Sequence, residues 1–311
     1  MEQTTSEFVC RMHLSKYLGT NPEVSIPDGV EIIDTQVFQG KESIKTVTFP
    51  ASVKTIDWSA FKECKNLEKA DLSRCENIWR LGDNLFQGCE RLTQVVLPKR
   101  LKYQATIPHQ CFADCSSLKM VSLPVGIVKI DRSAFSDCSS LLHIELPEGI
   151  GEIDQCVFRG CTSLECIDLP NSITFIGACA FQKCTNLSKV NLPSGIKAIC
   201  SHLFEGCTSL TEVAIPDGVE DIIYCAFKDC TSLSEITIPN SVTDIGENAF
   251  QGCKNLTHIY IPDSIEEIGK KAFAECAKGF VLQSSNPKWK AYALKERLKF
   301  ELIDDPYEKI I

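Results

Sequence analysis

One recurring aromatic residue constrains the fold of this chain more than any other feature. Phenylalanine returns at intervals of 23, 25 and 26 residues and then seven times at 23 residues. An aliphatic residue stands five positions before each Phe, Pro stands eleven positions before nine of them, and Cys stands three positions after ten of them. The eleven residues are Phe38, Phe61, Phe86, Phe112, Phe135, Phe158, Phe181, Phe204, Phe227, Phe250 and Phe273. Because one such unit is too short to enclose a core, only the stacking of successive units can bury these apolar side chains.

The local pattern inside each unit indicates how the chain runs. The Leu-x-x-Ile-x-Leu stretch ends in an alternation typical of a strand, and the Pro that follows has no N–H to continue a ladder. Ile-x-x-Ile predicts a second extended segment, and Ala/Val-Phe-x-x-Cys predicts one or two helical turns. The repeat therefore predicts an α/β solenoid of about eleven 23-residue units, with a curved parallel sheet on the concave face. Short helical turns and the second extended segments should lie on the outer sides, and each Phe should stack on the Phe of the next unit.

The complete repeat pattern resembles a known family. The pattern Ile-Pro-x-Gly/Ser-Val/Ile-x-x-Ile-x-x-x-Ala-Phe-x-x-Cys-x-x-Leu-x-x-Val/Ile-x-Leu/Ile is similar to the BspA-like, or Treponema-type, leucine-rich repeats over about residues 24–282. The stretch from Leu14 to Pro27 also resembles the opening of such proteins from gut bacteria. The resemblance implies a curved leucine-rich-repeat solenoid, and it implies adhesion at a bacterial surface or binding of host proteins. It implies no shared catalytic residues.

Atypical segments flank the repeats and predict the domain organisation. We expect an N-terminal cap over 1–26, the solenoid over 27–282 and a C-terminal cap over 283–311. Repeat arrays need such ends because the core of the terminal unit would otherwise face water. Pro287 favours a helix start, so the C-terminal cap should hold a helix over 288–299 and a last strand over 300–303. A helix that contacts a partner is the alternative interpretation of 288–299.

The two long intervals place extra residues in one segment, 73–103, which is also unusual in charge. It holds six basic side chains against three acidic ones, whereas the whole chain has a net charge of −9. Arg and aromatic residues are enriched at binding hot spots, so this segment is a candidate contact site. A solvated loop whose long side chains cover apolar surface explains the same residues equally well. The candidate binding residues are Arg74, Trp79, Arg80, Arg91, Lys99, Arg100, Lys102 and Tyr103.

The outward residues of the predicted strands form a second candidate surface, the concave face. Positions such as Glu145, Asp168 and Asn191 share no common chemistry from unit to unit, while the core positions do. Such variation suits a broad protein-binding surface, and it suits an unspecialised solvent face as well.

The 18 cysteines raise the question of disulfide, metal or catalytic chemistry. Cysteines stacked in a periodic column should have parallel Cβ vectors, which is the wrong geometry for a disulfide, so we expect a buried and reduced column. Cys156, Cys179 and Cys225, two positions before a Phe, should also be packing residues. The sequence has no Cys-x2-Cys pair of the kind that binds zinc. The best catalytic candidates are Cys111 with His109 and Cys200 with His202, but a separation of one residue fixes no useful geometry.

These observations favour a non-enzymatic protein-interaction module of unknown protein partner, which we expect to be a monomer. An intracellular scaffold is the alternative, and a cysteine-dependent hydrolase is the least favoured. The net charge argues against nucleic acid, no apolar run is long enough for membrane insertion, and no motif calls for a cofactor or a metal. The resemblance implies the cell surface. The first residues lack the basic and apolar regions of a signal peptide, and the thiols suit a reducing compartment, so these two features favour the cytoplasm.

Overall fold

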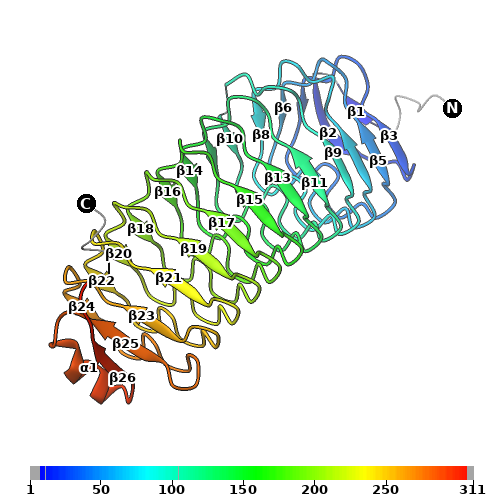
Figure 1. Cartoon of the computed structure of the whole chain (residues 1–311). Helices are drawn as coiled ribbons and strands as arrows, with labels where there is room; N and C mark the ends of the chain where they lie inside the picture. The colour runs from blue at the N-terminus through cyan, green and yellow to red at the C-terminus, as the bar shows by residue number, and fades with distance from the viewer. Residues whose placement is uncertain (1–7, 11, 104, 307–311) are drawn as a thin grey trace. The chain divides into compact units, whose positions relative to one another are not determined.

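Each sequence repeat forms one coil of a β-solenoid, in which a first strand, a second shorter strand and a turn around the Phe follow one another (Figure 1). The computed structural model describes residues 8–10, 12–103 and 105–306. The chain divides into two units, residues 1–164 and 165–311, which are described separately below. The described residues form about 12 turns, one more than the repeat count predicted.

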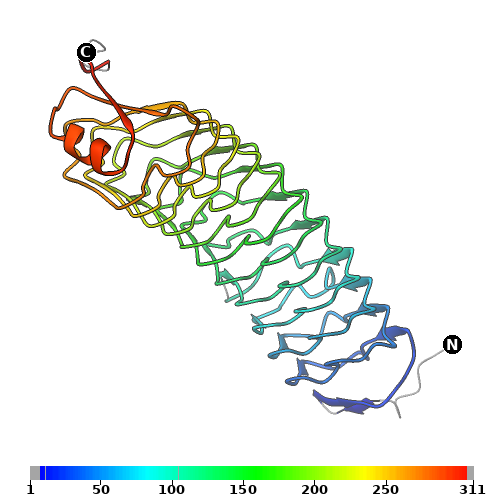
Figure 2. The ribbon, with the colours of Figure 1, turned by 90° about the horizontal axis from the view of Figure 1, so that it is seen from below.

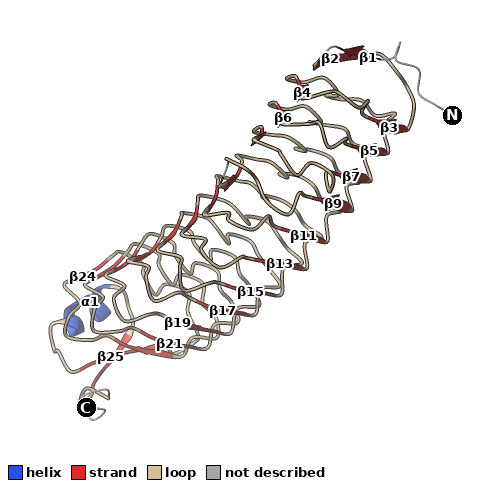
Figure 3. Ribbon diagram, turned by 90° about the horizontal axis from the view of Figure 1, so that it is seen from above, coloured by secondary structure: helices blue, strands red, loops and turns tan. Residues whose placement is uncertain are grey.

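The first strands of successive coils pair in parallel and in register, so equivalent residues of neighbouring coils lie side by side (Figure 3). In the first unit they are β3 (Glu23–Ser25), β5 (Thr46–Thr48), β7 (Lys69–Asp71), β9 (Gln94–Val96), β11 (Met120–Ser122) and β13 (His143–Glu145). In the second unit they are β15 (Cys166–Asp168), β17 (Lys189–Asn191), β19 (Glu212–Ala214), β21 (Glu235–Thr237), β23 (His258–Tyr260) and β25 (Val281–Ser284). The middle residue of these strands faces the core, and its neighbours face outward, as the alternation predicted.

The second strands form another parallel column, as the Ile-x-x-Ile pattern predicted. In the first unit they are β4 (Ile32–Ile33), β6 (Thr55–Ile56), β8 (Arg80–Leu81), β10 (Thr106–Ile107), β12 (Lys129–Ile130) and β14 (Glu152–Ile153). In the second unit they are β16 (Phe175–Ile176), β18 (Ala198–Ile199), β20 (Asp221–Ile222), β22 (Asp244–Ile245) and β24 (Glu267–Ile268). At the N-terminal end, β1 (Phe8–Cys10) pairs antiparallel with β2 (His13–Tyr17), and β2 continues the column by pairing with β4.

The extra residues of the first unit interrupt both of its columns at the same coil. The sheets end at β8 and β9 and start again at β10 and β11. The 26-residue interval between Phe86 and Phe112 holds more chain than one coil needs, so residues before β10 leave the ladder. An isolated parallel bridge between Arg100 and Val125 links this coil to the next one.

The prediction of helical turns around each Phe is wrong, and so is the α/β class; the fold is a β-solenoid with a single helix among the described residues. The residue two before the Phe and the residue two after it have positive φ in all eleven coils, from Gln36 and Gly40 to Lys271 and Glu275. A left-handed residue every four positions cannot continue a right-handed helix. Instead, backbone N–H groups of each turn donate to the next coil, as Phe204 N–H does to Ala226 O at 2.8 Å.

The phenylalanines fill the centre of each unit as the predicted aromatic stack. From Phe38 to Phe158 in the first unit, and from Phe181 to Phe273 in the second, neighbouring rings lie 4.6 to 5.8 Å apart and nearly parallel. These rings are 0 or 1% exposed. Tyr17 begins the first stack, and Phe280 ends the second. Burying these rings therefore stabilises each unit, beside the buried aliphatic columns.

The second unit ends in the only described helix, α1 (Trp289–Lys295), and a last strand, β26 (Lys299–Leu302), which pairs with β25 (Figure 2). The helix is shorter than predicted. It packs through Trp289 and Ala293, which are buried, and Tyr292 Oη donates to Gly269 O at 3.0 Å. Within the described residues, no helix has the length and apolar character needed to cross a membrane.

Candidate functional site

Four of the predicted binding residues come together in the first unit. Trp79 lies directly before β8, Arg80 begins that strand, and Lys102 and Tyr103 belong to the next coil. The backbone N–H of Lys102 donates to Ile78 O at 2.9 Å, which fixes the two segments beside each other. The rings of Trp79 and Tyr103 then meet edge to face, with centroids 6.0 Å apart.

A Lys or Arg cation lies near each of the three exposed rings at this place. Lys54 Nζ lies 5.6 Å from the Trp79 ring, the Arg80 guanidinium lies 5.3 Å from the Trp58 ring, and Lys102 Nζ lies 5.6 Å from the Tyr103 ring. Trp58, Trp79 and Tyr103 are 53, 44 and 73% exposed. We call the set of Lys54, Trp58, Trp79, Arg80, Lys102 and Tyr103 the aromatic–cationic surface. It spans three successive coils.

Two carboxylates hold parts of this surface in place. Lys54 Nζ lies 2.7 Å from a Glu31 carboxylate oxygen, and an Arg80 guanidinium nitrogen lies 3.7 Å from an Asp57 oxygen. Exposed pairs of this kind contribute little to stability, but they limit the positions that the two cations sample.

The sequence analysis missed Lys54 and Trp58. Both belong to a coil of ordinary length, outside the irregular segment, and nothing in their own surroundings marks them. Lys54 meets Trp79 because equivalent positions of successive coils are neighbours, and both stand two residues before the last residue of a second strand. Trp58 follows β6 and contacts Arg80 of the next coil, although these two positions are not equivalent. Comparing the outward positions of that strand column coil by coil would have found Lys54.

A cavity of about 270 Å³ lies beside the aromatic–cationic surface. Leu101, Ala105, Val125 and Gly126 give it apolar walls, and Arg100, Lys102 and Tyr103 also line it. Val125 is 59% exposed although it is aliphatic. The extra residues of this coil therefore create an open cavity lined by both apolar residues and cations.

The remaining predicted residues are exposed but do not join this surface. Arg74 follows β7, and Lys99 precedes the bridge at Arg100. Arg91 lies between Cys89 and β9, where its N–H donates to Lys65 O at 3.2 Å. Among the described contacts, none links these three side chains to the aromatic rings.

The outward side of the first strands offers the second predicted surface. In the second unit a cavity of about 380 Å³ runs over β17, β19 and β21. Its charged residues are Lys189, Glu212 and Glu235, and Lys189 already pairs with Glu212 at 3.2 Å. No large aromatic side chain lines it, so it lacks the features that mark the aromatic–cationic surface.

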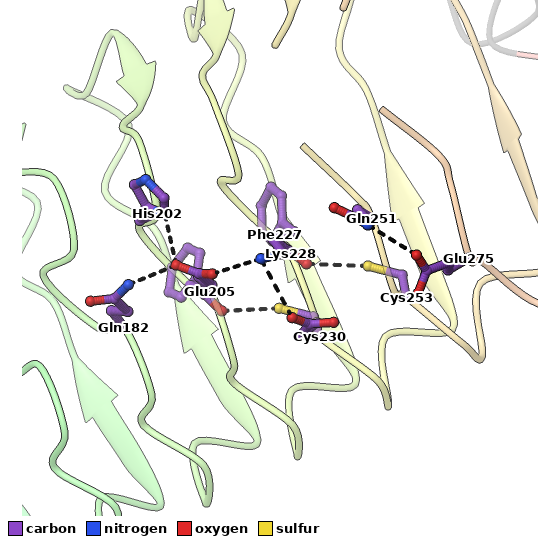
Figure 4. A network of polar contacts seen from close by, with 11 residues as sticks. Gln182, His202, Glu205, Phe227, Lys228, Cys230, Gln251, Cys253 and Glu275 are labelled. Atoms are coloured by element: carbon purple, nitrogen blue, oxygen red, sulfur yellow. Dashed lines mark hydrogen bonds and ion pairs between the residues drawn. The ribbon is translucent and has the colours of Figure 1, made fainter. Parts of the chain in front are cut away.

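The cysteine column is buried and forms no disulfide, as predicted, with Cys276 half-buried at its end. The sequence analysis missed what the thiols do. Each of nine column thiols donates a hydrogen bond to the carbonyl of the Phe in the preceding coil, as Cys253 Sγ does to Phe227 O at 3.2 Å (Figure 4). Cys225 is buried as expected, whereas Cys156 and Cys179, at the same position two before the Phe, are only half-buried.

The two catalytic candidates lack the environment of a nucleophile. Burial raises the pKa of the Cys111 and Cys200 thiols, whereas a catalytic thiolate needs a lowered pKa. His202 Nδ1 lies 2.7 Å from Glu205 Oε2, and Glu205 also contacts Gln182 and Lys228 (Figure 4). Burial alone would raise the pKa of Glu205, but the hydrogen bonds from Gln182, His202 and Lys228 hold it below its usual value. In the described part of the chain, no group of three or more His, Cys, Asp or Glu is arranged to hold a metal ion.

Comparison with known proteins agrees with this architecture. The family described as BspA type leucine rich repeat region (6 copies) matches residues 17–106, 105–231 and 197–296. A search of curated proteins finds no significant match.

Three solved structures share the fold. A leucine-rich repeat protein from Bacteroides ovatus has a TM-score of 0.63 at 25% identity, with 98% of this chain and 97% of that chain covered. A leucine rich cell surface protein from Faecalibacterium prausnitzii has a TM-score of 0.62 at 23% identity, with 94 and 91% covered. The pneumococcal vaccine antigen PcpA has a TM-score of 0.55 at 17% identity, with 94 and 92% covered.

Proposed function

Because this chain belongs to the BspA-type leucine-rich repeat family, we propose that it is a non-enzymatic protein-interaction module that acts in adhesion at a bacterial cell surface. The family consists of repeat modules that typically bind rather than catalyse. One protein of the same fold is itself named a cell surface protein. The raised pKa values of Cys111 and Cys200 weigh against the hydrolase alternative.

The aromatic–cationic surface carries the proposal. It exposes three large aromatic rings on three successive coils, each beside a Lys or Arg. Trp, Tyr and Arg are the residues that most often dominate the energy of a protein interface. The cation–π contacts and the Glu31 and Asp57 pairs hold the side chains in place before a partner arrives, so less side-chain entropy is lost on binding.

An intracellular scaffold is the second candidate, and the free thiols favour it. None of the 17 cysteines whose state the structure describes forms a disulfide. A chain with this thiol content is more typical of a reducing compartment than of an oxidising one. Antibody labelling of intact and of permeabilised cells distinguishes the candidates, because a surface protein is labelled in both and a scaffold only in the second.

The test of the binding surface uses two matched double variants. Trp58→Ala with Trp79→Ala removes two rings of the aromatic–cationic surface. Phe175→Ala with Tyr224→Ala removes two rings of similar exposure, 45 and 43%, in the second unit. Both variants and the wild type are immobilised, and partners are captured from host and bacterial extracts. The captured partner is then titrated against each protein.

We expect the Trp58/Trp79 variant to bind at least about 10-fold more weakly than wild type, because hot-spot residues contribute about 2 kcal/mol each. The Phe175/Tyr224 variant should bind like wild type. Circular dichroism checks that both variants are folded. Unchanged affinity in the Trp58/Trp79 variant, with a partner that binds the wild type, would show that the surface is not the binding site.

A further inference from the structure

We infer that the partner contacts the aromatic–cationic surface with an extended acidic segment that also places one apolar side chain in the neighbouring cavity. This inference rests on the proposed function and names the chemistry of the partner at the same surface. Its occupant is a stretch of Asp or Glu residues interrupted by an aliphatic residue, supplied by another protein.

The spacing of the cations supports an extended segment. Lys54, Arg80 and Lys102 come from three successive coils. Neighbouring strands lie about 4.8 Å apart, so the three coils cover about 10 Å along the first unit. An extended chain advances about 3.3 Å per residue, so three or four of its residues span that length. One short acidic segment can therefore reach all three cations at once.

Two of the three cations keep most of their charge available to a ligand. Each cation lies over one aromatic ring, which is a weak partner with no full negative charge. Lys102 has no carboxylate within ion-pair distance among the described residues, and Arg80 has only the long 3.7 Å contact with Asp57, whereas Lys54 is paired with Glu31 at 2.7 Å. A carboxylate of the partner can therefore add to the cation–π contacts without displacing them.

The cavity next to these cations explains why the segment should also carry an apolar residue. Leu101, Ala105 and Val125 give it an apolar part that suits an aliphatic side chain, while Arg100 and Lys102 line the rest. At about 270 Å³ it has room for one such side chain. An apolar anchor flanked by carboxylates is thus the sequence that fits both features.

The same features fit nucleic acid less well, although it is also a polyanion. Bases bind single-strand proteins by stacking on open ring faces. Here the rings of Trp79 and Tyr103 meet edge to face, and a cation lies over each of them.

Tryptophan fluorescence of the full chain provides the test. Trp58 and Trp79 are exposed and Trp289 is buried, so a spectral change on titration reports on the aromatic–cationic surface. The probes are three short capped peptides in which one central Leu interrupts a run of Glu, of Gln or of Lys, and a single-stranded oligonucleotide. We expect the Glu peptide to bind at least about 10-fold more tightly than the Gln peptide, with an affinity that falls as salt rises. The Lys peptide and the oligonucleotide should bind more weakly still.

Matched variants separate this site from general charge effects. Arg80→Glu with Lys102→Glu should abolish binding of the Glu peptide and create binding of the Lys peptide. Lys189→Glu with Lys197→Glu changes the net charge equally in the second unit, where both lysines are exposed, and should leave binding unchanged. Val125→Asp should weaken binding about 10-fold, while Val128→Asp, at a similarly exposed valine outside the cavity, should not.

The possible results distinguish this inference from the proposed function. Equal binding of the Glu and Gln peptides, no binding of either, or tighter binding of the oligonucleotide would each overturn the acidic-segment inference. The proposed function would still hold if a captured protein lost affinity in the Trp58/Trp79 variant. The proposed function fails only if the captured protein binds the Trp58/Trp79 variant as tightly as the wild type, and the peptide results do not bear on it.

Discussion

The residues with positive φ around each Phe allow a stability prediction in which a substitution changes the backbone preference but few side-chain contacts. Lys183 and Gly206 occupy the same position in neighbouring coils, two residues after the Phe, with φ of 61° and 76°. Each N–H donates to the next coil, to Glu205 O at 2.7 Å and to Lys228 O at 2.8 Å. A Cβ added at Gly206 would come no closer than 3.5 Å to any atom, so Gly206→Ala tests backbone conformation without a steric clash.

The magnitude follows from two opposing terms. The left-handed conformation destabilises the folded state by about 1–2 kcal/mol for a residue with a Cβ. Ala offsets part of this, because it loses about 0.4–1 kcal/mol less chain entropy than Gly on folding. Gly206→Ala should therefore lower the free energy of unfolding by about 1 kcal/mol. By the same reasoning Lys183→Gly should be neutral or raise it by up to about 1 kcal/mol.

Urea unfolding followed by circular dichroism measures both changes. Ala274→Gly, one residue after Phe273 at a position without positive φ, is the control, and it should lower the free energy of unfolding by about 0.5–1 kcal/mol. Introducing Gly should therefore keep or raise the free energy of unfolding at position 183 and lower it at position 274. If Gly206→Ala stabilised the protein, or if Lys183→Gly cost as much as Ala274→Gly, the left-handed turn would not be the reason that these segments are not helical.

Four further substitutions test the core and the site. Phe227→Ala removes the ring between Phe204 and Phe250, and urea unfolding should show a loss of about 3–5 kcal/mol. Cys230→Ala removes the thiol bond to Phe204 O and should cost about 1 kcal/mol in the same assay, because that carbonyl keeps the N–H of Cys207. The native pKa of Glu205 is lowered, so its ionised carboxylate contributes to the free energy of unfolding at neutral pH, and this contribution is lost as pH falls through that pKa. Glu205→Gln should therefore flatten the acid limb of a plot of unfolding free energy against pH. Gly82→Ala would place a Cβ 2.5 Å from the backbone of Asp57 and Trp58, so thermal unfolding should show a loss of about 1–3 kcal/mol and tryptophan fluorescence should shift.

The sequence predicted the features that depend on burial. The Phe stack, both strand columns and the buried cysteines follow from apolar residues at fixed spacing, since only stacked coils can hide them. Backbone conformation at the turns was predicted wrongly because a short apolar pattern does not distinguish a helix from a turn. The necessary signal was present: the position two after the Phe is Gly or Asp in eight of eleven repeats, and these residues tolerate positive φ best.

The site was predicted only in part for a different reason. The irregular segment drew attention to Trp79, Arg80, Lys102 and Tyr103, which do come together. A segment of sequence is nevertheless the wrong unit for a solenoid surface, because neighbours on the surface come from successive coils. Trp58, outside the segment and in the preceding coil, therefore contacts the Arg80 guanidinium, while Arg91, inside the segment, has no described contact with the rings.

The exposed aromatic rings require an explanation that folding does not supply. In each unit the stability comes from buried Phe, Ile and Leu columns and from thiol bonds to Phe carbonyls. The three cation–π contacts are worth about 0.5–1 kcal/mol each at exposed sites, a range that exposed Lys–Glu ion pairs can also reach without exposing Trp. Trp58 and Trp79 keep apolar ring area in water on adjacent coils. A partner that covered these rings would remove that area from water, which is the physical reason that we propose this surface as the binding site.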